Sequence, residues 1–182
     1  MNKRMLAALV ALAGVFVALY LAMYKLGYIG TLVCRVGSCE TVQTSRWATL
    51  LGTPVAIWGV GYYVAVLAVS LAGLSARLGD SRRLSRVLVL MALTGVLFSL
   101  WLTYLELFVI HAVCMWCVIS AMLAVLLLVL AMIDLREVTT AARLDAEALA
   151  EEAAAGLRGS GYGIGIRNTE EVSVRAIEAT DD

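Results

Sequence analysis

Charged residues are scarce in this chain of 182 residues. They make up only 15% of it, whereas soluble domains carry about 25%. Hydrophobic residues reach 62%, and the mean hydropathy is +0.91. This composition excludes an ordinary soluble domain and predicts a membrane protein.

The chain also lacks a net charge, because two regions of opposite sign cancel. Residues 1–133 carry nine Lys and Arg against three Asp and Glu, a net charge of +6. Residues 134–182 carry five Arg against eleven Asp and Glu, a net charge of −6. Without an overall basic excess, a nucleic-acid partner is not expected.

Four apolar runs are long enough to cross a bilayer as helices. They are Met5–Tyr24, Trp47–Ala76, Val87–Leu105 with an extension to about Ile110, and Val113–Ile133. The single proline, Pro54, follows Thr53, which predicts a helix start in the second run. We therefore expect an all-α four-helix transmembrane domain at 1–135, with an outer loop and a short amphipathic helix as its cap.

Basic residues predict the orientation of the four helices. One side has eight of them: Lys3, Arg4, Arg77, Arg82, Arg83, Arg86, Arg136 and Arg143. The other side has three: Lys25, Arg35 and Arg46. This asymmetry predicts a multi-pass protein of a prokaryotic plasma (inner) membrane, with both termini cytoplasmic. A cleaved signal peptide is the alternative for the first run, which is longer than the 7–15 apolar residues typical of such peptides.

Four cysteines fall in two close pairs on the predicted outer side, where disulfides persist. Cys114 and Cys117 form C-M-W-C at the start of the fourth run, so their side chains share one helix face. A helix N-terminus favours the thiolate, which is the nucleophile in disulfide exchange. Cys34 and Cys39 lie in a polar loop in which Gly37 permits a tight turn. That loop is long enough to bring Cys39 over Cys114.

Two other arrangements of the cysteines stay open. Four thiolates on one side of a membrane are also a ligand set for zinc. Two purely structural disulfides are the second alternative, although such short loops restrict the unfolded chain little. Either arrangement would make the protein a non-enzymatic tetraspan.

The order of these motifs resembles the vitamin K epoxide reductase family over roughly residues 5–135. The resemblance rests on four spans, the outer-loop cysteine pair, T-S-R-W at 44–47, G-x-G-Y-Y at 59–63 and C-x-x-C opening the fourth span. It implies a thiol–disulfide relay. A separate thioredoxin-like protein outside the cytoplasm would deliver electrons to Cys34, and Cys39 would exchange with Cys114. Cys117 would then reduce a membrane quinone of the ubiquinone or menaquinone type.

The resemblance also assigns smaller roles and shows two departures. Ser45 matches a family Ser/Thr near the active site, where a hydroxyl would orient a cysteine or a quinone oxygen. Val55 and Ala121 stand where vertebrate members carry a substrate-binding Asn and a Tyr. The chain therefore lacks two hydrogen-bond partners for a quinone carbonyl. We accordingly expect thiol oxidation with quinone as acceptor rather than epoxide reduction, in support of disulfide formation outside the cytoplasm.

Aromatic side chains near the outer boundary are candidates to line a quinone pocket. Trp47 shares a predicted helical face with Leu50 and Leu51, which suggests a surface lid or an interfacial anchor. The other candidates are Trp58, Tyr62 and Trp116. Packing between helices is the alternative role for all of them.

Two ionisable residues near the cysteines are candidates for a proton relay. Glu106 is the only carboxylate within a predicted span, where such groups are functional candidates. His111 is the only histidine and lies three residues before Cys114. A structural Glu and an ordinary interfacial His are the alternatives.

Residues 136–182 are predicted to be a cytoplasmic acidic tail. It starts with an Ala- and Glu-rich helix, continues through a glycine-rich linker at 156–165, and ends in a flexible or weakly strand-like segment. The tail has no cysteine. A thioredoxin-like partner is therefore expected to be a separate chain.

Overall fold

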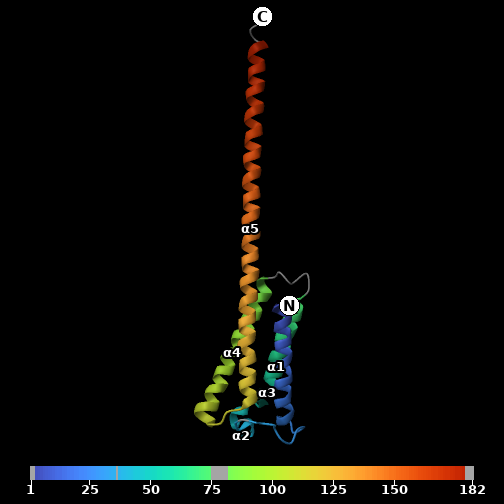
Figure 1. Cartoon of the computed structure of the whole chain (residues 1–182), viewed down its shortest axis with the longest axis vertical. Coiled ribbons are helices and arrows are strands. Elements are labelled where there is room, and N and C mark those ends of the chain that lie inside the picture. Colours follow the sequence, from blue (N-terminus) through green and yellow to red (C-terminus); the bar gives the residue numbers. More distant parts are fainter. Residues whose placement is uncertain (1–2, 36, 75–81, 179–182) are drawn as a thin grey trace. The chain divides into compact units, whose positions relative to one another are not determined.

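The computed structural model describes residues 3–35, 37–74 and 82–178, with side chains as far as residue 155. In chain order its elements are α1 (Lys3–Lys25), α2 (Cys39–Thr44), η1 (Arg46–Ala48), β1 (Thr49–Leu50), β2 (Thr53–Pro54), α3 (Val55–Ala72), α4 (Arg82–Tyr104), η2 (Leu105–Ile110) and α5 (Met115–Glu178) (Figure 1). The chain divides into two compact units, Met1–Val138 and Thr139–Asp182. The sequence places this boundary between residues 135 and 136. Arg77 lies outside the described residues.

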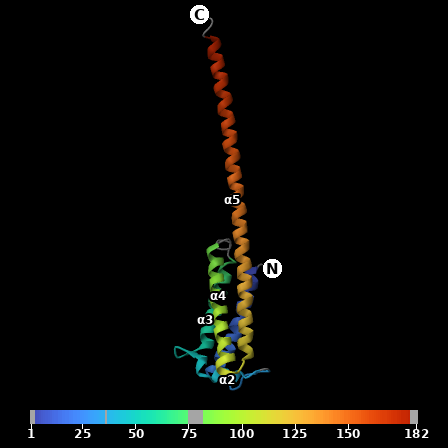
Figure 2. The same cartoon turned by 90° about the vertical axis from the view of Figure 1, so that its left-hand side faces the viewer.

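The first unit is a bundle of α1, α3, α4 and the first part of α5, which run side by side in both views (Figures 1 and 2). Among the described residues, four helical stretches are long and apolar enough to cross a membrane: Lys3–Lys25, Val55–Ala72, Arg82–Ile110 and Met115–Ala155. Large apolar side chains such as Phe16, Leu97 and Met122 are more than half exposed, which suits a lipid surrounding. The prediction of an all-α membrane protein with four spanning helices is confirmed.

Small residues let the helices approach closely. Ala11 and Ala131 are fully buried, and Ala7 and Ala18 are nearly so. Helices in lipid associate by such close packing, since apolar burial between them gains little there. At Gly14 a Cβ atom would lie only 2.3 Å from the ring of Tyr63, so glycine is required there for α3 to pack against α1.

The paired tyrosines of G-x-G-Y-Y join α3 to its neighbours. The Tyr62 hydroxyl donates to the Met91 carbonyl of α4 at 3.1 Å. The Tyr63 hydroxyl donates to the Ser120 carbonyl of α5 at 2.9 Å and lies 2.8 Å from the Ser120 hydroxyl. In an apolar surrounding each such bond satisfies a group that would otherwise be costly to bury. This motif therefore fixes the centre of the bundle.

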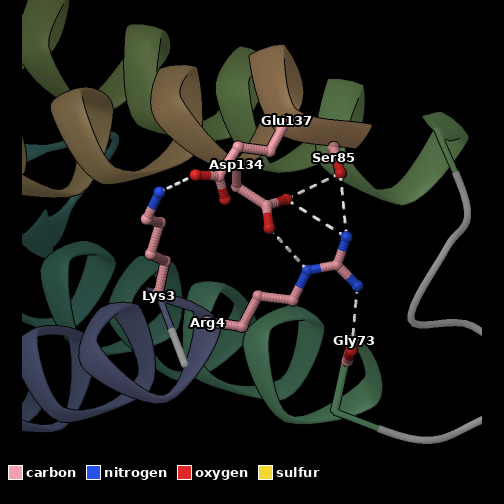
Figure 3. A network of polar contacts seen from close by, with 6 residues as sticks. All are labelled: Lys3, Arg4, Gly73, Ser85, Asp134 and Glu137. Atoms are coloured by element: carbon pink, nitrogen blue, oxygen red, sulfur yellow. Dashed lines mark hydrogen bonds and ion pairs between the residues drawn. The ribbon is translucent and has the colours of Figure 1, made fainter. Parts of the chain in front are cut away.

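A buried ion pair closes the end of the bundle where α1 begins, which we call the Arg4 end (Figure 3). Arg4 donates to both carboxylate oxygens of Asp134, at 2.8 and 3.2 Å. It also donates to the Gly73 carbonyl at 2.8 Å and to the Ser85 hydroxyl at 3.0 Å, and Ser85 in turn donates to Asp134 at 2.7 Å. Lys3 and Glu137 form a second pair beside it.

This network joins three helices, α1, α4 and α5, and also Gly73, which follows α3. Arg4 is only 5% exposed and Asp134 only 8%. Each donor and acceptor of the pair has a partner, which is the condition under which a buried ion pair is tolerated. From the sequence, Arg4 is predicted only to be one of the flanking basic residues that set the orientation. Its role in joining the helices depends on Asp134, a partner 130 residues away.

The opposite end of the bundle, which we call the cysteine end, is capped by residues 26–54 and by the turn between η2 and α5. The predicted helical face of Trp47, Leu50 and Leu51 does not form. Instead η1 is followed by a hairpin in which Leu50 pairs with Thr53. Leu51 and Gly52 both have positive φ, 54° and 78°, as a two-residue hairpin turn requires, so the chain reverses there. The short helix of this cap is α2.

The start of α3 agrees with the sequence in position but not in detail. The helix starts at Pro54 as predicted, but Pro54 is the residue before the helix and not part of its first turn. Thr53 does not cap it, because Thr53 is engaged in the hairpin and Pro54 itself occupies the N-cap position without a side-chain cap bond.

The helix α5 continues through residues 156–165, where the sequence predicts a linker, and ends at Glu178. Glycine weakens a helix by about 1 kcal/mol relative to alanine but, unlike proline, removes no hydrogen bond. The only proline of the chain is Pro54, so this stretch contains no obligatory helix breaker.

Candidate functional site

The loop after α1 holds one cysteine pair in a disulfide. Cys34 and Cys39 are joined with their Cα atoms 6.1 Å apart, and Cys39 is the first residue of α2. Between them Gly37 has φ +89°, a conformation that glycine adopts without strain. A Cβ atom at Gly37 would lie 2.2 Å from the Val113 carbonyl oxygen. Both the turn and the neighbouring chain therefore require glycine.

The same glycine attaches the loop to the second cysteine pair. Gly37 and Cys114 form an isolated antiparallel bridge, and the Ser38 N–H donates to the Val113 carbonyl at 3.0 Å. Cys39 and Cys114, 1% and 0% exposed, pack in one buried cluster with apolar side chains of α1 and α2. Two pairs 75 residues or more apart in sequence are thus brought together at the cysteine end.

A second clamp holds the loop beside Cys34. The Trp116 indole N–H donates to the Val33 carbonyl at 3.1 Å, and the Val33 N–H donates to the Tyr20 hydroxyl at 3.1 Å. The rings of Tyr20 and Trp116 lie 4.9 Å apart between centroids. Both backbone groups of Val33 are therefore fixed, and with them the position of the disulfide. The sequence alone gives no sign of the role of Tyr20.

The second pair, Cys114 and Cys117, is reduced and lies at the start of α5. Cys114 precedes the helix, and its carbonyl accepts the Val118 N–H at 3.1 Å. The hydrogen bond with the Cys117 thiol lowers the pKa of the Cys114 thiol to about 7, although burial and the nearby Glu106 oppose this shift. A thiol with a lowered pKa is a better leaving group in exchange and is more often present as thiolate.

Glu106 lies within the turn that leads to the cysteines. Its segment, η2, is a π-helix, a feature frequent at functional sites. The carboxylate is 4% exposed, accepts the Cys114 N–H at 3.0 Å and is hydrogen-bonded to the Cys117 thiol. The Glu106 carbonyl also accepts the Ala112 N–H at 3.0 Å. His111, the residue after η2, is exposed and takes a left-handed conformation with φ 55°.

An apolar cavity of about 420 Å³ opens among α1, α3, α4 and α5 under the 45–50 segment. Six of the predicted site residues line it: Ser45, Trp47, Trp58, Tyr62, Glu106 and Cys117. The structure places the other predicted residues, Cys34, Cys39, Cys114, His111 and Trp116, around the loop and the turn instead. Among the aromatic candidates, Trp116 therefore belongs to the loop clamp.

One wall of the cavity was not predicted. It is formed by α4 residues that share a helix face with the predicted Glu106: Thr94, Gly95, Phe98, Ser99, Leu102 and Thr103. The available signal is the spacing of Ser99, Thr103 and Glu106, which puts three polar groups on one stripe of an apolar span.

The Ser45 hydroxyl is engaged locally. It donates to the Val42 carbonyl at 2.7 Å, which closes the end of α2, while the residue lines the cavity. Its oxygen can still accept a hydrogen bond.

The described part of the chain contains no group of three or more His, Cys, Asp or Glu side chains arranged to hold a metal ion. With Cys34 and Cys39 joined to each other, a four-thiolate zinc site is not formed in this arrangement.

One family of known proteins matches most of the bundle. Residues 5–132 match the family described as "Vitamin K epoxide reductase family". A comparison with curated proteins finds no match.

Proposed function

Because the chain belongs to the vitamin K epoxide reductase family, we propose that it is an integral-membrane thiol:quinone oxidoreductase. The family carries an oxidoreductase activity in a membrane. The finer proposal is that this chain reoxidises a separate thioredoxin-like protein and reduces a membrane quinone, supporting disulfide formation outside the cytoplasm.

One observation carries the proposal. The disulfide Cys34–Cys39 is held by the Gly37–Cys114 bridge beside Cys114, whose partner thiol, Cys117, lines an apolar cavity. This order is a path along which disulfide exchange can pass two electrons from the loop to the cavity.

In the proposed relay, a thiolate of the reduced partner attacks Cys34, and Cys39 leaves. The partner's second thiolate completes its own disulfide, so that Cys34 and Cys39 become thiols. Cys39 then attacks Cys114 of an oxidised Cys114–Cys117 pair, and Cys34 attacks Cys39 to restore the loop disulfide. The arrangement in the structure, with the loop oxidised and Cys114 and Cys117 reduced, corresponds to the step before the quinone is reduced.

The cavity suits the ring of a quinone. Its volume lies within the range of about 300–1,000 Å³ typical of small-molecule sites, and its wall is mostly apolar with a few polar groups. A bound quinone would supply a two-electron, two-proton acceptor. Trp58, Tyr62 and Phe98 offer flat apolar faces to its ring, and Trp47 and Ser45 lie on the wall formed by the cap.

The departure at Val55 supports quinone as acceptor rather than epoxide as substrate. Val55 lines the cavity where the vertebrate enzymes are expected to carry an Asn, so this position offers no side-chain hydrogen bond. Ala121 likewise carries no hydroxyl. We propose that the ring is held mainly by shape and apolar contact.

The orientation remains a proposal drawn from charge. Basic residues gather at the Arg4 end, which we place in the cytoplasm of a prokaryote, with the cysteines on the outer side. The exposed His111 remains a predicted proton relay residue at that outer surface.

The test is anaerobic mixing of the purified protein with a reduced thioredoxin-like oxidant and a quinone, following quinone absorbance. The wild type should reduce the quinone, and Cys117→Ala should not. Ser70→Ala is the control, because Ser70 is buried in α3 with no hydrogen-bond partner in the described structure. A free-thiol count that never changes when quinone is added would instead support a non-enzymatic tetraspan with structural disulfides.

A further inference from the structure

The turn between α4 and α5 is built around one buried carboxylate, and we propose that Glu106 is a further catalytic residue. It carries a proton from the Cys117 thiol to the acceptor in the cavity. This inference rests on the proposed function, and it assigns the proton path of the second half-reaction to a single side chain.

Geometry places Glu106 between the reacting thiol and the acceptor site. Its carboxylate is hydrogen-bonded to the Cys117 thiol, and its side chain lines the cavity that Cys117 also lines. The Cys114 N–H, 3.0 Å from Oε2, fixes the carboxylate in this position. The donor of the proton and the space for its acceptor are therefore both within reach of one group.

The charge of Glu106 is not explained by the fold. An uncharged amide oxygen would accept the Cys114 N–H equally well, without the cost of burying a carboxylate. Among the described residues that line the cavity, Glu106 is the only acidic or basic one, and the other titratable ones are Cys117, Tyr62 and Tyr63. Two ion pairs, Lys3–Glu137 and Arg4–Asp134, lie at the other end of the bundle.

The step balances as follows. The Cys117 thiol gives its proton to Glu106, and Cys114, which has lost its proton to water, forms the disulfide with Cys117. The two electrons released pass to the quinone, Glu106 gives its proton to one quinone oxygen, and water supplies the proton for the other. Two thiols and a quinone thus become one disulfide and one quinol, and Glu106 returns to the carboxylate.

The decisive variant is Glu106→Gln, which keeps the size and the acceptor oxygen but carries no proton. Single-turnover quinone reduction should slow by about 10²–10⁴-fold, the usual contribution of general acid–base catalysis. Exchange between the loop disulfide and a reduced thioredoxin-like protein should keep its wild-type rate, and the KM for quinone should stay within about twofold. Glu147→Gln, an exposed position on α5, is the matched control and should behave as wild type.

Three results would overturn the inference. They are quinone reduction by Glu106→Gln at the wild-type rate, a change confined to KM, and an equal loss of exchange and quinone reduction, which is the mark of a structural role. If Glu106→Gln does not fold, Glu106→Asp decides, because its shorter carboxylate withdraws from Cys117. Its quinone step should slow at least tenfold with exchange unchanged, and an unchanged quinone step contradicts the proposal.

Failure of the proposed function gives a different pattern. A wild type that reduces none of the quinones tested contradicts the quinone assignment itself. An active wild type with an equally active Glu106→Gln contradicts only the proton role.

Discussion

Both ends of the bundle bury a carboxylate, and the two carboxylates have different surroundings. Asp134 at the Arg4 end is paired with a guanidinium and a hydroxyl, and each of these groups has further partners. Glu106 at the cysteine end accepts one backbone N–H and meets the thiol of Cys117. A carboxylate held by a permanent cation is suited to joining helices. One that meets a cysteine thiol beside a cavity is suited to chemistry.

The comparison predicts that a substitution at the Arg4 end lowers the stability of the protein and leaves the rate of quinone reduction unchanged. Arg4→Met leaves Asp134 buried without its cation, which should lower the free energy of unfolding by about 3–5 kcal/mol. Quinone reduction per folded molecule should be unchanged. Denaturation in detergent, together with single-turnover rates, measures both quantities.

Adding Asp134→Leu to Arg4→Met is the control for this prediction. Removing both charges should restore most of the lost stability, since the cost comes from the unpaired charge. If the double variant is as unstable as the single one, the loss of stability comes from the lost contacts of the pair and not from the unpaired charge. Slower quinone reduction by folded Arg4→Met would contradict the prediction that the Arg4 end contributes to stability alone.

A substitution at the cysteine end should slow disulfide exchange between the two cysteine pairs. Gly37→Ala places a methyl group against the Val113 carbonyl and opposes the positive φ at the same time. The bridge to Cys114 should open, and exchange between Cys39 and Cys114 should slow at least tenfold. Rapid quenching that traps the Cys39–Cys114 mixed disulfide in a Cys117→Ala background measures this rate.

The matched control is Gly27→Ala. Gly27 has φ +82°, close to that of Gly37, but no atom lies within 4 Å of a Cβ built there. The control should therefore show only the backbone strain of about 1–2 kcal/mol, without a loss of exchange. Equal exchange rates in the two variants would mean that the contact with Val113 does not position the loop.

The paired thiols predict a dependence on pH that the Arg4 end does not share. Hydrogen bonding to Cys117 lowers the pKa of Cys114 to about 7, so the Cys114 thiolate should be lost as pH falls through that value. Attack by Cys114 on the loop disulfide, which is the reverse of the proposed transfer from Cys39 to Cys114, should thus slow roughly tenfold between pH 8 and pH 6, because the thiolate is the nucleophile. Ultraviolet absorbance of the thiolate reports the titration. In Cys117→Ala the midpoint should rise, and an unchanged midpoint would remove Cys117 as the cause.

Much of the bundle could be predicted from the sequence, because its signals are local. Uncharged runs predict spans by length alone, and Pro54 predicts the start of α3. The hairpin at 49–54 was missed because an apolar pattern of five residues fits a helix as well as a strand, and the positive φ of Leu51 and Gly52 decides between them.

The site was predictable as a set of residues but not as an arrangement. The meeting of Glu106 with Cys114 and Cys117 depends on the π-helical turn of η2 and on the left-handed residue that follows it, and neither has a sequence signature. The role of Arg4 depends on Asp134, and that of Trp116 on a backbone carbonyl 83 residues away. Contacts of this kind are set by how the helices pack rather than by local pattern.

The smallest expected effect concerns the loop clamp at the cysteine end. Trp116→Phe keeps an aromatic ring against Tyr20 but removes the indole N–H that the Val33 carbonyl accepts. The loss of one neutral hydrogen bond should weaken the clamp by about 0.5–1.5 kcal/mol. The loop should then open more often, and a reduced thioredoxin-like protein should attack Cys34 up to about tenfold faster. Phe108→Leu, on the exposed side of η2, is the control and should leave this rate unchanged. If Trp116→Phe alters the KM for quinone and leaves the rate of attack on Cys34 unaltered, Trp116 acts at the cavity and its assignment to the loop clamp is wrong.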